Sequence, residues 1–257
     1  MESELEFAKK LAYDAGEIMR KYFNQVDISR YKADNTIVTL ADEEINQMVI
    51  DRVSENYPDH GVYGEEDSSG RDKNILWVCD PLDGTAMYAR GIPVAVFSIA
   101  LVVDGEPQLG VVYDPWTDRM YSATKAGGAY LNDKQIRVNK YSLADRGAVI
   151  GYDYVSGMPF NTLKAAYNLH KNTYLMSIGS MVHGVILVAS GVSVAYIASG
   201  SRPHDIAAAK IIVEEAGGRV TSIYGEDQRY DRDIKGAVIS NGVVHDEIIR
   251  AIKKELK

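Results

Sequence analysis

Residues 75–85 constrain the fold of this chain more than any other stretch, because an apolar run meets an acidic turn there. The run Ile-Leu-Trp-Val-Cys at 75–79 predicts a buried strand of a sheet. Asp80-Pro81 should end this strand, since proline has no N–H for the sheet and disfavours the helical region for its predecessor. Asp83-Gly84 marks a second turn, and the threonine that follows opens a predicted helical turn. The sequence thus predicts two carboxylates at a strand's end, beside the N–H groups of a helix start.

Two interpretations of this acidic turn are open. Clustered carboxylate oxygens suit hard divalent cations, and the N–H groups of a helix start suit phosphate. Asp, Gly and Thr are equally ordinary residues of turns and helix caps that bind no ligand. The turn alone does not choose between a metal–phosphate site and a structural turn, so acidic residues elsewhere in the chain have to decide.

Composition narrows the class of protein. The chain has 257 residues, enough for one large domain or two closely packed ones, and its formal net charge of -8 disfavours a general nucleic-acid binder. A phosphate ester substrate remains compatible with this charge, because bound cations would reverse it locally. Cys79 is the single cysteine and lies in the predicted buried strand, so we expect a small core residue and a reducing, cytoplasmic setting. No apolar run approaches the roughly 20 residues that span a bilayer, and the acidic start of the chain does not resemble a signal peptide, so we expect no membrane association.

The first half of the chain is predicted to form two helices followed by a sheet. Apolar residues recur at helical spacing over 3–24, and Ser3 with Glu6 matches a capping box at the start of that helix. A second helix is predicted over 41–55, with Asp42 in its first turn, where the helix dipole alone would explain an acidic residue. A short strand from residue 61 runs into Glu65 and Glu66. Turn-bounded apolar segments then predict an antiparallel meander over 94–103, 108–113, 120–123 and 129–131.

From about residue 140 onward, predicted strands and helices alternate, which is typical of α/β architecture. Strands are predicted over 148–152, 173–178, 192–197 and 237–240. Helices are predicted over 159–170, 180–189 and 203–216, the last before a Gly-Gly pair suited to a C-cap, and a final helix starts near residue 244. We therefore predict two tightly packed parts, an N-terminal α+β part over 1–140 and a C-terminal α/β part over 141–257.

Acidic residues stand at the ends of four predicted elements: Asp42, Glu65 with Glu66, Asp80 with Asp83, and Asp205. Taken alone, Asp205 is better explained as a first-turn residue of its helix, but the combination matches a known arrangement. In order and spacing, the chain resembles the inositol monophosphatase family of Mg2+-dependent, often lithium-sensitive phosphatases, whose superfamily includes fructose-1,6-bisphosphatase and 3′-phosphoadenosine 5′-phosphate phosphatase. The segments that carry the resemblance are Val38-Thr-Leu-Ala-Asp42, Gly64-Glu-Glu66, Asp80-Pro-Leu-Asp-Gly-Thr85, His204-Asp-Ile-Ala207 and Glu215-Ala-Gly-Gly218.

The resemblance implies a layered α-β-α-β-α sandwich and a set of metal ligands. Glu65, Asp80 and the carbonyl of Leu82 would hold one Mg2+. Asp80, Asp83 and Asp205 would hold a second ion, and a third, weaker one would lie on the Glu65 side. Clustered carboxylates are unfavourable without cations, which supports metal binding over a structural role. Two metals can clamp an in-line phosphoryl displacement, for which Thr85, hydrogen-bonded to Asp42, would with Glu65 orient and deprotonate the attacking water.

The resemblance also implies where the substrate lies. The N–H groups of Gly84 and Thr85 would receive phosphate oxygens, and residues 179–181 resemble the family's segment beside the substrate. Arg202 would bind a second phosphate or form surface ion pairs, and both interpretations stay open. Substrate contacts are therefore expected from Leu82, Asp83, Gly84, Thr85, Gly179, Ser180, Met181, Arg202 and Asp205.

Two departures from the family pattern bear on the site. The family's tryptophan before the last aspartate is His204 here, for which we expect the same packing role, with metal ligation as the minor alternative. Ala198 stands where inositol-specific members carry a glutamate that binds ring hydroxyls. The second departure puts selectivity for inositol in doubt.

We therefore predict a Mg2+-dependent phosphomonoesterase, a homodimer by resemblance, that hydrolyses small sugar or polyol phosphates as an inositol monophosphatase, a fructose-1,6-bisphosphatase or both. A nucleotide phosphatase, such as one for 3′-phosphoadenosine 5′-phosphate, is the alternative among enzymes. A non-catalytic regulatory protein on the same fold is the alternative from another class, and loss of a metal carboxylate or of Thr85 would favour it. The sequence retains these residues. The expected partners are a small phosphorylated metabolite and a second copy of the chain, without nucleic acid or membrane.

Overall fold

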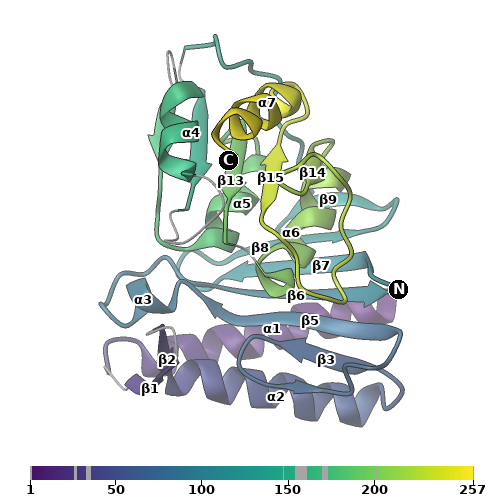
Figure 1. Ribbon diagram of the computed structural model, residues 1–257. Coiled ribbons are helices and arrows are strands. Elements are labelled where there is room, and N and C mark those ends of the chain that lie inside the picture. The colour runs from purple at the N-terminus through teal and green to yellow at the C-terminus, as the bar shows by residue number, and fades with distance from the viewer. Residues whose placement is uncertain are drawn as a thin grey trace.

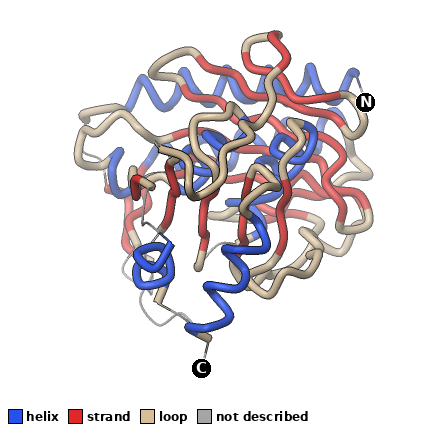
Figure 2. Tube along the Cα trace, turned by 90° about the horizontal axis from the view of Figure 1, so that it is seen from above, coloured by secondary structure: helices blue, strands red, loops and turns tan. Residues whose placement is uncertain are grey.

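The protein stacks its elements in five layers: a helix pair, a large sheet, a second helix pair, a smaller sheet and a third helix pair (Figure 1). The structure is a computed structural model that describes residues 2–25, 28–32, 36–146, 148–153, 161–169, 173–200 and 202–256. In the view from above, strands lie between helices and the two chain ends lie far apart (Figure 2). This arrangement confirms the predicted α-β-α-β-α sandwich.

Helices α1 (Glu2–Tyr22) and α2 (Leu40–Asn56) cover the outer face of the large sheet (Figure 1). Their apolar sides pack with Trp77 of the sheet in one buried cluster. The predicted capping box of Ser3 with Glu6 is wrong, because the chain is already helical at Glu2 and the Ser3 hydroxyl donates to Glu4. Helix α2 does begin with a capping box, formed by Thr39 and Asp42. A small hairpin of β1 (Ile28–Tyr31) and β2 (Ile37–Thr39) lies between the two helices in the chain.

The large sheet has eight strands in the order β10-β9-β8-β7-β6-β5-β3-β4. Strands β5 to β9 pair as antiparallel neighbours, which confirms the predicted meander, and β3 pairs with β5 in parallel. The parallel pair brings the end of β3 beside the acidic turn after Cys79, which is buried as predicted. The strands are β3 (Gly61–Gly64), β4 (Ser68–Ser69), β5 (Ile75–Asp83), β6 (Val96–Val103), β7 (Glu106–Asp114), β8 (Arg119–Thr124), β9 (Gly128–Leu131) and β10 (Lys134–Gln135).

Strand β5 continues past Pro81, so the prediction that Asp80-Pro81 ends it is wrong. It pairs with β6 up to Asp80 opposite Ser98, shifts register, and pairs again at Asp83 opposite Val96. An irregularity of this kind tolerates proline, because the unpaired position needs no N–H. The helical turn after the strand is confirmed as α3 (Thr85–Tyr88). Both aspartates are thus held at the end of an interior strand of the sheet rather than by a free loop.

Helices α5 (Met181–Ala189) and α6 (Pro203–Glu215) fill the layer between the two sheets (Figure 1). Helix α6 contacts β5, β6 and β7 on one side and β14 and β15 on the other. Their apolar residues join both sheets in a single buried cluster. This layer places the start of α6, which carries Asp205, over the end of β5.

The smaller sheet has five strands in the order β12-β11-β13-β15-β14. Strand β11 pairs in parallel with β12 and β13, whereas β15 runs antiparallel to β13 and β14. The strands are β11 (Val149–Tyr152), β12 (Tyr174–Met176), β13 (Ala195–Ala198), β14 (Arg219–Thr221), which was not predicted, and β15 (Ala237–Ser240). Helices α4 (Thr162–Leu169) and α7 (His245–Glu255) cover the outer face of this sheet. Helix α4 corresponds to the helix predicted over 159–170, of which residues 159, 160 and 170 lie outside the described residues.

Residues 222–236 connect β14 to β15 and reach the large sheet (Figure 1). Tyr230 is buried, and its N–H donates to the carbonyl of Gly105 at 2.9 Å. The hydroxyl of Tyr63, on β3, donates to Asp233 at 2.8 Å. These contacts connect the two sheets beside α6. The predicted division of the chain into two parts near residue 140 stays a prediction. Within the described stretches, none of the helices combines the length and apolar character needed to cross a bilayer.

Candidate active site

Three aspartates converge at the end of β5. Asp80 and Asp83 flank the irregularity in this strand, and Asp205 lies in the first turn of α6. Each offers one carboxylate oxygen, and the three oxygens lie within 4.8 Å of one another. Asp80 and Asp83 are only 1% and 7% exposed, so their charges are poorly solvated. The sequence placed these acids at the ends of elements, and the fold brings them together.

The start of α5 binds Asp83. The Ser180 hydroxyl donates to this carboxylate, and so do the N–H groups of Met181 at 3.1 Å and Val182 at 2.9 Å. Backbone donors at a helix N-terminus stabilise negative charge. Ser180 and Met181 were predicted to contact substrate. Their donors bind Asp83 in the structure, and the contact with substrate stays a prediction. Val182 was missed, because a backbone donor leaves no signal in the residue type.

Burial raises the pKa of these carboxyls. The pKa of Asp83 and that of Asp205 rise to about 7, and that of Asp80 lies well above its ordinary value, with the neighbouring carboxylates adding to the effect. Ionised carboxylates packed in this way repel one another unless a cation neutralises them. Their all-oxygen donor set suits a hard divalent cation such as Mg2+. The three residues therefore fit a metal centre.

Glu65 follows β3 and approaches the same centre, where it meets a lysine that the sequence did not single out. The Lys32 ammonium lies 2.8 Å from Glu65 and 2.7 Å from Glu66. Burial raises the pKa of Glu65, but positive charge on His204 and on Lys32, which is in direct contact, outweighs burial and holds this pKa below its ordinary value. Glu66 is also bound by Arg30, at 3.0 Å. The sequence around Lys32 is polar and has no periodic pattern, so only the fold reveals that Lys32 lies against Glu65 at the metal centre.

Thr85 and Asp42 are in contact beside the aspartates. The Thr85 hydroxyl lies 3.0 Å from Asp42 Oδ1 and 3.0 Å from the carbonyl of Leu82. The other oxygen of Asp42 accepts the Thr39 N–H at 2.8 Å, so this residue caps its helix and reaches Thr85 at once. Burial raises the pKa of Asp42 to about 7. The contact required by the predicted water-activating pair is present.

Gly84 permits the tight approach of these segments. Its φ of 97° lies in the left-handed region, and a Cβ there would come within 3.0 Å of the Ser180 side chain. Gly179 has a φ of 77° and faces Met87 in the same way. Both glycines are therefore explained by backbone geometry, and their predicted contacts with substrate remain predictions.

Comparison with known protein families matches residues 1–257 to the model of the inositol monophosphatase family. The chain belongs to the inositol monophosphatase family. It is 31% identical over 252 residues to the fructose-1,6-bisphosphatase/inositol-1-monophosphatase of Thermotoga maritima, an alignment that covers 97% of this chain and 96% of the relative. It is 33% identical over 232 residues to the Nus factor SuhB of Pasteurella multocida, covering 88% and 87%. A solved inositol monophosphatase from Thermotoga maritima has a TM-score of 0.88 at 30% identity, covering 98% of this chain and 97% of the other.

This inositol monophosphatase family member is a phosphoric monoester hydrolase. The family is metal-dependent and acts on small phosphorylated substrates, and the clustered aspartates are the groups here that could bind the metal. The alternative of a non-catalytic protein on the same fold is thereby set aside. The identity of the substrate is a finer question, on which three residues around α6 bear.

The phosphatase carries Arg202, His204 and Asp153 around Asp205. Arg202 is exposed just before α6, and its backbone N–H donates to Asp205. His204 is buried and packs edge-on against Tyr63, with ring centroids 6.4 Å apart. Asp153 accepts the Ser199 N–H at 2.8 Å, and burial raises its pKa. Asp153 was not predicted, although an acidic residue directly after a strand was the signal that identified Asp80.

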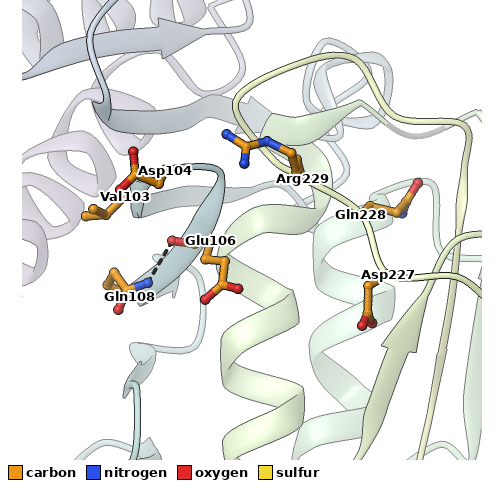
Figure 3. A pocket seen from close by; sticks show the side chains of 7 residues that line it. All are labelled: Val103, Asp104, Glu106, Gln108, Asp227, Gln228 and Arg229. Carbon is orange, nitrogen blue, oxygen red and sulfur yellow. Dashed lines mark hydrogen bonds between the residues drawn. The ribbon is translucent and has the colours of Figure 1, made fainter.

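A hollow of about 590 Å³ lies elsewhere on the phosphatase, between the β6–β7 turn and residues 227–229 (Figure 3). Its walls are formed by Val103, Asp104, Glu106, Gln108, Asp227, Gln228 and Arg229. Arg229 lies over Gly105, where a Cβ would come within 2.7 Å of the guanidinium. None of these residues belongs to the aspartate cluster, so the chemistry of the family is not located there.

Proposed function

We propose that this phosphatase is a Mg2+-dependent phosphomonoesterase of small sugar and polyol phosphates. The observation that carries the proposal is the convergence of Asp80, Asp83 and Asp205 within 4.8 Å beside the Thr85–Asp42 pair. Glu65, Asp80 and the Leu82 carbonyl would hold one ion, and the three aspartates a second. Bound Mg2+ would neutralise phosphate charge and make water more acidic.

The residues of the chain would then move the proton of the attacking water. Thr85 can accept a hydrogen bond from that water through its hydroxyl oxygen while it donates to Asp42 Oδ1, 3.0 Å away. The pKa of Asp42, raised by burial to about 7, suits a group that takes up this proton near neutral pH. The proton would pass from water to Thr85 and from Thr85 to Asp42. Glu65, on the other side, would help to orient the same water.

The preferred substrate is proposed from two residues, Ala198 and Arg202. Ala198 is buried and apolar, so it cannot bind the hydroxyls of an inositol ring. Arg202 is exposed beside Asp205, and a guanidinium pairs well with the oxygens of a second phosphate. The Thermotoga maritima relative is named for fructose 1,6-bisphosphate and inositol 1-phosphate. We therefore propose a broad enzyme that hydrolyses fructose 1,6-bisphosphate at the 1-phosphate and also accepts inositol 1-phosphate. A cytoplasmic location and a homodimer remain predictions.

A phosphate-release screen over a panel of metabolites tests this function. The panel should include fructose 1,6-bisphosphate, inositol 1-phosphate and 3′-phosphoadenosine 5′-phosphate, each with Mg2+ and with EDTA. We expect turnover of several sugar and polyol phosphates with Mg2+ alone. Strict selectivity for inositol 1-phosphate, or for the nucleotide, would contradict the proposed substrate class while leaving the metal-dependent mechanism in place.

A further inference from the structure

His204 lies beside the aspartates, and one of its two ring nitrogens has no hydrogen-bond partner among the described residues. The residue is 5% exposed, and Nδ1 has no partner in the described part of the protein. Nε2 lies 3.9 Å from Oδ1 of Asp205, which is too long for a hydrogen bond. Burying a polar atom without a partner costs free energy. The packing role expected from the sequence explains the ring but gives its nitrogens no function, and Nε2 is the nitrogen that faces the aspartates.

The orientation of Asp205 directs one of its oxygens to His204. Oδ2 accepts the Arg202 N–H at the start of α6, whereas Oδ1 is the oxygen closest to Nε2. Two atoms that bind one ion at about 2.1 Å lie roughly 3.0 Å apart as neighbours and roughly 4.2 Å apart when opposite. The observed 3.9 Å falls between these limits. A closure of about 1 Å would bring Nε2 and Oδ1 to the separation of neighbouring ligands of one ion.

The ring of His204 is held in place by its neighbours. It packs edge-on against Tyr63, with an interplanar angle of 81°. Tyr63 is fixed in turn, because its hydroxyl donates to Asp233 at 2.8 Å and the guanidinium of Arg71 lies 3.6 Å above its ring. A ligand held in this way needs little reordering when an ion binds. Tyr63 thus acts as a positioning residue for His204.

We propose that His204 is a nitrogen ligand of the metal centre, on its Asp205 side. Imidazole nitrogen suits Zn2+, Ni2+ and Cu2+, whereas Mg2+ prefers oxygen. His204 therefore makes this centre bind transition metal ions more tightly, relative to Mg2+, than its carboxylates alone would. The inference rests on the proposed function, since it takes the aspartates as metal ligands.

Pulsed electron paramagnetic resonance of the Mn2+-loaded protein tests this directly, because a coordinated imidazole gives a nitrogen modulation. We expect this modulation in the wild type, with the change of frequency that follows from ¹⁵N-labelled histidine, and its loss in His204→Gln. His183→Gln is the matched control, since the His183 ring contacts the Val94 carbonyl at 2.9 Å, and it should keep the signal. Calorimetry should show Zn2+ affinity falling at least tenfold in His204→Gln, with Mg2+ affinity changing less than threefold.

The outcomes separate this inference from the proposed function. If Mn2+ binds the wild type without nitrogen modulation, His204 is not a ligand and the carboxylate centre survives. The labelled wild type needs no variant, so a failure of His204→Gln to fold does not affect this result. If neither Mn2+ nor Mg2+ binds, and Asp205→Asn behaves like the wild type, both the inference and the metal-dependent function are overturned.

Discussion

Replacing Asp83 by Asn should change how the stability of the metal-free phosphatase depends on pH. Burial raises the pKa of Asp83 from 3.8 to about 7 in the folded protein. Between these values the folded protein holds a proton that the unfolded chain has released. This proton stabilises the fold at low pH, and the contribution is lost as pH rises through about 7. Asn cannot titrate, so the variant should not show this loss.

The size of the effect follows from the two pKa values. For one carboxyl with pKa values of about 7 folded and 3.8 unfolded, the linkage relation gives a loss of roughly 2–3 kcal/mol between about pH 5 and pH 8. Asn also accepts fewer of the hydrogen bonds from α5, which costs about 1–2 kcal/mol at every pH. The stability of Asp83→Asn relative to wild type should therefore rise by roughly 2–3 kcal/mol over this range. Buried histidines such as His245, whose pKa is lowered, titrate in both proteins and cancel.

Urea unfolding of the two EDTA-treated proteins at several pH values measures this difference. Asp59→Asn, which makes the same exchange at an exposed position, is the matched control and should run parallel to wild type. Saturating Mg2+ should stabilise the wild type most at high pH, because it binds only the folded carboxylates. Parallel profiles for Asp83→Asn and wild type would refute the reasoning, since they would mean that this carboxyl titrates in its ordinary range.

Three further substitutions test separate parts of the site. Thr85→Ala should lower kcat by about 10²–10⁴-fold, because the variant loses a proton carrier. Its Mg2+ affinity, measured by calorimetry, should not change, because no metal ligand is removed. A change in metal affinity without a change in kcat would contradict the proton path. Lys32→Gln should raise Mg2+ affinity roughly tenfold, because an ammonium 2.8 Å from Glu65 no longer opposes the cation. Arg30→Gln is the control for this variant. Equal Mg2+ affinities in all three proteins would show that Lys32 does not oppose metal binding. Arg202→Ala should raise KM for fructose 1,6-bisphosphate about tenfold and that for inositol 1-phosphate little; equal losses on both would make Arg202 a surface residue.

The acidic centre could be predicted because its residues stand at ends of strongly patterned elements. The apolar run before Asp80 and the apolar helix after Asp205 are visible in the sequence, and they place both aspartates at the ends of elements. The course of β5 was mispredicted because proline was taken as a strand end. Pairing with β6 resumes at Asp83, and such tertiary pairing overrides the local signal.

Other parts of the site depend on contacts between distant segments. Lys32 reaches Glu65 across 33 positions of sequence, and nothing in its own neighbourhood indicates this. The N–H groups that hold Asp83 come from residues almost a hundred positions away, and backbone donors have no sequence signal. The His204 Nδ1, which has no partner in the described part of the chain, likewise follows from burial, which the sequence at this position does not reveal.

Titrating Mg2+ into enzyme stripped with EDTA tests whether the aspartate cluster is a metal-dependent phosphatase centre. Phosphate release from fructose 1,6-bisphosphate should be absent at the start and should rise to saturation as Mg2+ is added. Asp205→Asn should need far more Mg2+ or fail to recover. Full phosphate release by the rigorously metal-free enzyme would contradict the account.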